Sequence, residues 1–254
     1  MITKRHAFAL AASGAVLAGT AGYVLAQDQD DQEKSRFIRF VEEQLSTPNR
    51  QIRLNGIQGT LSSNVRFESI TIADENGVWL TIENPSLQWQ RSALILGKLD
   101  IRNLSADRID WPRNPIPDEN LPAPESSGFS LPELPVSVDI GELAIGEAQF
   151  GEPVFGLAST LSLEGQISLG DGTLNTDLDI TRLDGPGGQL ALQAAYSNAT
   201  TQLDLDLSLQ EPADGVVANL IDIPERPPVS LTLAGGGQLD DLDLGLAFDV
   251  DSRR

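Results

Sequence analysis

Residues 201–210 read TQLDLDLSLQ, and in this stretch apolar and polar residues alternate. The apolar set is Leu203, Leu205, Leu207 and Leu209. Because a β-strand sends successive side chains to opposite faces, the stretch predicts a strand with one leucine face and one acidic face. The leucines could contact a second sheet in a closed sandwich, or something that is not protein. Alternation alone is compatible with both arrangements.

The same period of two recurs from residue 157 to residue 250. Glycine-rich and Asn-containing stretches, such as Gly170-Asp171-Gly172 and Ser197-Asn198, separate the alternating segments and favour tight turns. Short connections predict an antiparallel meander. The apolar parity supplies the candidate lining residues of a groove: Leu161, Leu163, Ile167, Leu169, Leu174, Leu178, Ile180, Leu190, Leu192, Leu203, Leu205, Leu207, Leu209, Leu231, Leu233, Leu242, Leu244 and Leu246.

Composition limits the class of partner. The chain has 254 residues, 40% of them hydrophobic, which is enough for a folded core. A net charge of −20 argues against nucleic acid or an anionic lipid surface as the main partner, since both require a basic face. With no cysteine, the chain has neither a disulfide framework nor a thiol nucleophile.

The N-terminus is typical of an exported protein. Lys4 and Arg5 precede residues 7–26, an uncharged segment about as long as the roughly 20 residues needed to span a bilayer. Uncleaved, this segment predicts a single-pass inner-membrane anchor with the rest of the chain in the periplasm. Val24-Leu25-Ala26 also fits a signal-peptide cleavage site, which would release a secreted domain.

Composition and periodicity divide the chain into five parts. Residues 1–27 are the anchor or signal, and residues 28–47 predict an amphipathic connector helix that either caps the sheet or lies on the membrane. Residues 48–113 form a first β unit, and residues 114–135 a proline-rich linker or strap that cannot pair along a ladder. Residues 136–254 hold the amphipathic β-groove repeats.

The residues give little support for catalysis. The single histidine, His6, lies beside the export signal, so the exported part can form no Ser-His-Asp arrangement and no imidazole metal site. Carboxylate pairs such as Asp204 and Asp206 recur as the polar half of alternating strands, which favours a solvated face over a catalytic pair or calcium site. We therefore expect no enzyme, cofactor or metal.

Two stretches resemble a known family. Residues 50–115, RQIRLNGIQGTLSSNVRFESITIADENGVWLTIENPSLQWQRSALILGKLDIRNLSADRIDWPRNP, are similar to the N-terminal region of the TamB family, the inner-membrane component of the translocation and assembly module. Residues 216–246, VVANLIDIPERPPVSLTLAGGGQLDDLDLGL, resemble a second region of that family, and the order and spacing of the two carry the resemblance. The family is similar to the AsmA-like and bridge-like lipid transfer proteins.

The resemblance implies a mostly β protein whose curled, open β-groove (β-taco-like) follows an N-terminal transmembrane or signal helix. It implies an inner-membrane anchor, a periplasmic groove that carries phospholipid acyl chains, and support for outer-membrane protein assembly. It also implies a TamA-like outer-membrane barrel of the Omp85 type as partner, through a C-terminal region absent from this chain, which we expect to be truncated. The alternative is an assembly scaffold that pairs substrate strands at its sheet edge.

Overall fold

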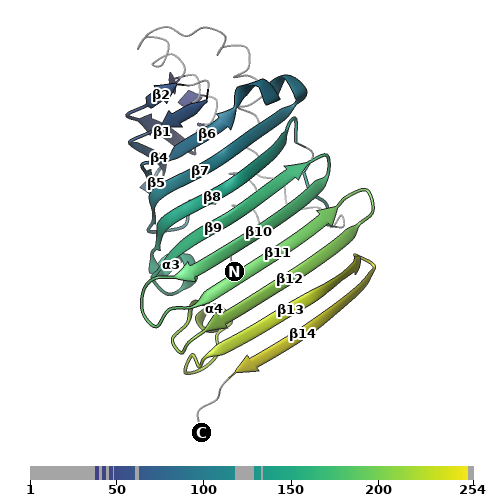
Figure 1. Cartoon of the computed structure of the whole chain (residues 1–254). Coiled ribbons are helices and arrows are strands. Elements are labelled where there is room, and N and C mark those ends of the chain that lie inside the picture. Colours follow the sequence, from purple (N-terminus) through teal and green to yellow (C-terminus); the bar gives the residue numbers. More distant parts are fainter. Residues whose placement is uncertain are drawn as a thin grey trace.

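One open β-sheet makes up most of the computed structural model (Figure 1), which describes residues 38–39, 42–43, 46–47, 49–60, 63–117, 129–132 and 134–250. The first seven strands are β1 (Gln51–Asn55), β2 (Gln58–Thr60), β3 (Asn64–Arg66), β4 (Ser69–Asp74), β5 (Gly77–Glu83), β6 (Ser86–Gln90) and β7 (Lys98–Trp111). The others are β8 (Ser137–Phe150), β9 (Ser159–Gly170), β10 (Thr173–Arg182), β11 (Gln189–Ser197), β12 (Gln202–Glu211), β13 (Val229–Gln238) and β14 (Asp241–Val250). The named helices are the 3₁₀-helix η1 (Arg91–Leu96), α3 (Glu152–Phe155) and α4 (Val216–Leu220).

The strand order follows the sequence in the second half of the chain. From β8 to β14 each strand pairs antiparallel with the next, and the path continues on the other side through β7, β5 and β4 to β1. Strand β6 also pairs with β7, and the ribbon of β3 and β2 extends from β6. The mostly β prediction and the open sheet are confirmed for the described residues, whereas the anchor predicted at residues 1–27 lies outside them.

The antiparallel meander expected from the short turns of residues 157–250 is confirmed there by β9–β14, whereas the preceding strands β7 and β8 are parallel and the strands of the first unit do not all pair in sequence order. A parallel pair needs a connection long enough to carry the chain back along the strand. The proline-rich segment is that connection, and its described ends lie at opposite ends of β7. Near Trp111, Ile116 N donates to Asp74 Oδ2 (2.9 Å), whereas near Lys98, Ser137 N donates to Gly97 O (2.9 Å).

The first β unit buries its apolar side chains against one another. Its core consists of Ile52, Leu54, Ile72, Trp79 and Leu80, and Ile38 from the predicted connector helix packs against it. Ile38 and Arg39 are helical, as are Glu42 and Glu43. The contact of Ile38 with the core favours the interpretation in which this helix caps the sheet over the one in which it lies on the membrane.

Candidate functional site

The backbone register places the predicted groove residues on one side of the sheet, here called the apolar face. Residues directly opposite each other on neighbouring strands share a face. Leu205, for example, lies opposite Ala194 of β11 and Gly235 of β13, and Leu207 lies opposite Leu192 and Leu233. Asp204 and Asp206, between these leucines in the sequence, therefore belong to the other side, the polar face.

Four rows of such residues cross the eight strands from β7 to β14. The first consists of Leu99, Val138, Leu169, Leu174, Tyr196, Leu203, Gly237 and Leu242. The second consists of Ile101, Ile140, Ile167, Thr176, Ala194, Leu205, Gly235 and Leu244. The third consists of Leu104, Leu143, Gly165, Leu178, Leu192, Leu207, Leu233 and Leu246. The fourth consists of Ala106, Ile145, Leu163, Ile180, Leu190, Leu209, Leu231 and Phe248.

All but one of the candidate residues stand in these rows. The exception, Leu161, lies opposite Ala148 and Arg182, one step beyond the fourth row. Most of the candidates are only half-buried, Leu242 and Leu246 are exposed, and Leu209 alone is buried. No second sheet lies over the apolar face among the described residues, since their strands all belong to one sheet. A closed sandwich would have buried these leucines.

Leu209 is buried because α4 covers the fourth row of the apolar face. It forms a cluster with Val229 and with Ala218 of α4, which is 0% exposed. The buried carboxylate of Glu211 holds the helix there by accepting hydrogen bonds from the N–H groups of Val217 (2.9 Å) and Ala218 (3.2 Å). A carboxylate at a helix N-terminus satisfies donors that would otherwise have no acceptor. Leu209 is thus protein core rather than open surface.

The fourth row lies along one edge of the apolar face, here called the α4 rim. This rim carries the one basic side chain in the strands β9–β14. Arg182 lies on the apolar face, yet its guanidinium is directed into the loops: Nε and Nη2 donate to Asp184 (3.1 Å each) and Nη1 donates to Asp214 O (3.1 Å). Burial raises the pKa of Asp184, but hydrogen bonds from Arg182 and from Thr160 N outweigh it, so the net pKa lies below its usual value. The hydrogen bond to Asp214 O fastens the end of β10 to the loop before α4.

A second rim lies at the other end of the strands. Tyr196, in the first row, donates from its hydroxyl to Phe129 O (3.1 Å), and the two rings meet edge to face with centroids 4.9 Å apart. Leu131 is buried, and its backbone exchanges two hydrogen bonds with the Asn198 side chain (2.8 and 3.0 Å). The end of the proline-rich segment therefore borders the first row. The second and third rows form the open floor between the two rims.

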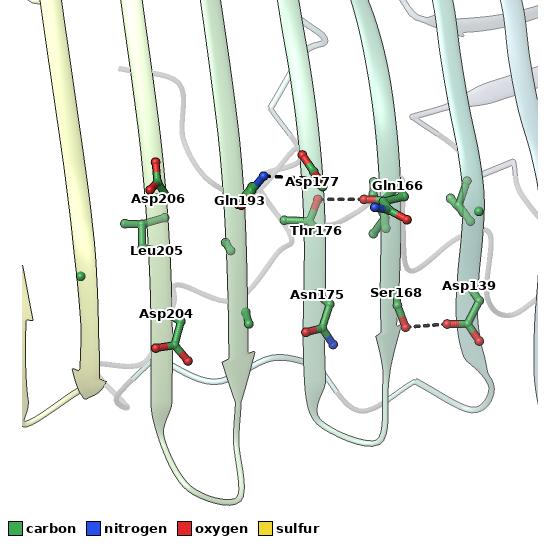
Figure 2. Close-up of a pocket in the computed structure, with 16 residues that line it drawn as sticks. Asp139, Gln166, Ser168, Asn175, Thr176, Asp177, Gln193, Asp204, Leu205 and Asp206 are labelled. Carbon is green, nitrogen blue, oxygen red and sulfur yellow. Dashed lines mark hydrogen bonds between the residues drawn. The ribbon is translucent and has the colours of Figure 1, made fainter.

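The polar face is hollowed over β8–β13. The hollow has a volume of about 650 Å³, and the carboxylates of Asp139, Asp177, Asp204 and Asp206 lie along it on three strands (Figure 2). Asp204 and Asp206 are exposed, as the solvated-face interpretation requires. Among the described residues, no group of His, Cys, Asp and Glu side chains is arranged to hold a metal ion.

The apolar rows extend onto β7 and β8, which the candidate list omitted. In β8 the apolar residues are Val138, Ile140, Leu143, Ile145 and Ala148, and the register against β9 shifts between Ile140 and Leu143 and between Ile145 and Ala148. Each β-bulge adds one residue to a strand and so breaks strict alternation. The sequence signal that could have identified β8 is its set of apolar residues, which alternate in short stretches with one extra residue inserted at each bulge.

Comparison with models of known protein families gives a match over most of the chain. Residues 37–252, most of the chain, match the model of a family described as YdbH-like: Intermembrane phospholipid transport protein YdbH. No curated protein and no solved structure shows significant similarity to the chain. Within the described residues, no helix is both long enough and apolar enough to cross a membrane.

Proposed function

The chain belongs to the YdbH-like family, and from this we propose that its apolar face carries the acyl chains of phospholipids between two membranes. The bridge-like lipid transfer class implied by the sequence resemblance agrees with this family. The narrower assignment to TamB has no support from the family match, which describes phospholipid transport.

The observation that carries the proposal is the apolar floor of the second and third rows, over which the described part of the chain places no second sheet. Most of its side chains are half-buried, although Ile101 and Leu143 are buried and Leu246 is exposed. Covering the accessible apolar area would contribute roughly 25 cal/mol for each Å² removed from water. Acyl chains suit such a surface because they need no hydrogen-bond partner. No catalytic group is required for this role.

The length of the rows fits the proposed cargo. Seven strand spacings of about 4.8 Å separate β7 from β14, so each row is roughly 34 Å long. A hydrocarbon layer of about 30 Å holds two chain lengths, so that one acyl chain is about 15 Å long. A chain lying across the strands would therefore occupy about half of a row and could move along it without leaving apolar surface.

The proposed setting is the inner membrane and periplasm, with residues 7–26 as the anchor. The export signal and the family description support this setting. Partnership with a TamA-like barrel and strand pairing during protein assembly remain predictions from the resemblance to TamB.

Photo-crosslinking in cells tests the proposal directly. A photoreactive residue at Leu205 should attach phospholipid, identified by mass analysis, whereas the same residue at Asp206 on the opposite face should not. Attachment only to protein at Leu205, from this chain or from a substrate, would contradict lipid carriage and favour the scaffold alternative.

A matched pair of charge substitutions tests transport. Leu205→Arg places a cation on the open floor and should block lipid movement between membranes, because an acyl chain cannot solvate it. Gln210→Arg adds the same charge to an exposed, polar-face position of β12 and should leave transport intact. Equal transport in the two variants would contradict a route over Leu205.

A further inference from the structure

The η1 helix carries the two most exposed large apolar side chains of the described chain. Ile95 is 88% exposed and Leu96 77%. The residues just before them are anchored, since Ala93 is buried and Leu94 packs against the clusters of Trp89 and Val136. The inner side of η1 is thus fixed on the sheet, and Ile95 and Leu96, here called the η1 tip, point away from it.

Backbone geometry holds this tip at the end of a long hairpin. η1 joins β6 to the start of β7, the 14-residue strand Lys98–Trp111 (Figure 1). Gly97 closes the helix at φ 71°, a left-handed conformation that favours glycine, and its N–H donates to Leu94 O (3.0 Å). Strand β7 pairs with β6 near η1 and with β5 near its other end, so the β4–β5 turn lies beyond the far end of β7, more than about 40 Å away if the strands rise 3.3 Å per residue.

Charge around the tip differs from that of the whole chain. Residues 84–99 contain no Asp or Glu, while Arg91 and Lys98 flank the tip. The next acidic residue, Asp100, alternates with the apolar-face residues Leu99 and Ile101 and so belongs to the polar face. An apolar tip with basic flanks suits the boundary between phospholipid headgroups and acyl chains.

We propose that the η1 tip inserts into the surface of a phospholipid bilayer and fixes the adjacent end of the sheet against it. Ile95 and Leu96 enter the apolar boundary, and Arg91 and Lys98 face the anionic headgroups. The net negative charge of the chain lies mainly beyond residue 113. A local contact of the η1 tip with anionic lipid is therefore compatible with the argument that an anionic surface is not the main partner of the whole chain. The proposal is independent of acyl-chain carriage on the apolar face.

The absence of cysteine in the natural chain permits a single fluorescent probe. Ser92 is exposed and lies three residues before Ile95, hence on the same side of a 3₁₀-helix. The full chain with Ser92→Cys, labelled with nitrobenzoxadiazole, is added to vesicles of phosphatidylethanolamine and phosphatidylglycerol that carry a nitroxide on the acyl chains. Asn76→Cys, exposed in the β4–β5 turn, is the matched control.

We expect the nitroxide to quench the probe at position 92 several-fold and to leave the probe at position 76 unchanged. Ile95→Ser with Leu96→Ser in the Ser92→Cys background should abolish the quenching while the far-ultraviolet circular dichroism stays that of the sheet. Arg91→Gln with Lys98→Gln should raise the vesicle concentration needed for half-maximal quenching roughly tenfold or more, at a fixed phosphatidylglycerol content.

Two outcomes would overturn the proposal. A brighter probe at position 92 without nitroxide quenching would mean that protein, such as the chain's own N-terminal segment, covers the tip. Equal quenching at positions 92 and 76 would mean unspecific adsorption. Neither readout involves the rows of the apolar face, so failure here leaves the crosslinking test at Leu205 unaffected.

Discussion

The first β unit and the later strands share one pleated sheet but cover their apolar side chains differently. In the first unit the strands β1–β6 have three to seven residues, a side ribbon branches from β6, and Leu80 is 4% exposed. Strands β9–β14 have nine to twelve residues and join mostly through tight turns, which leave little chain to cover a face. Alternation therefore yields a core only where the chain folds back over itself.

The largest expected effect contrasts a leucine in each region. Leu80→Ala should lower the free energy of unfolding by about 3 kcal/mol, because it leaves a cavity in a closed core, whereas Leu205→Ala should cost only about 1 kcal/mol on the open face. Urea unfolding of the full chain measures both. Trp79, Trp89 and Trp111 all report on the first unit, and circular dichroism reports on the whole sheet. Equal losses would mean that the apolar face is closed in solution.

A smaller effect concerns α4, which covers the later strands at one rim. Glu211→Ala removes the acceptor of the helix N–H groups and should cost about 1–2 kcal/mol. In a Leu209→Cys background it should also speed reaction of the thiol with a maleimide. Glu164→Ala, an exposed carboxylate on β9, is the control. Unchanged labelling of Cys at position 209 would show that α4 does not depend on this cap.

The last effect is a pH dependence in the first unit. Hydrogen bonding from Arg113 lowers the pKa of Asp74 from 3.8 to about 2, outweighing the cost of burial. A carboxyl group whose pKa is lowered by folding stabilises the fold at any pH above its usual pKa. This contribution disappears as the pH falls from about 3.8 to about 2.

Asp74→Asn should therefore lower the urea midpoint near neutral pH but scarcely at pH 2. Asp243→Asn, at an exposed position on β14, serves as the control. A difference between wild type and Asp74→Asn that persisted at pH 2 would exclude the ion pair as its cause.

Parity predicted the facing of the later strands because consecutive residues of a regular strand alternate without exception. The register places Leu203, Leu205 and Leu207 together on the face that TQLDLDLSLQ indicates. The same reasoning omitted β8, whose two bulges interrupt the alternation, and could not show that β7 and β8 run parallel. A proline-rich connection excludes ladder pairing within itself but does not fix the direction of the strand that follows.

The sequence by itself determined the mostly β class and the two-faced character of the strands, because these depend on residue type and on spacing along the chain. Only the tertiary structure decided that the described strands place no second sheet over the apolar face, that α4 buries Leu209, and that Ile95 and Leu96 project from the end of a hairpin. Coverage of a side chain depends on which distant segments return to it, and local alternation carries no information about that return.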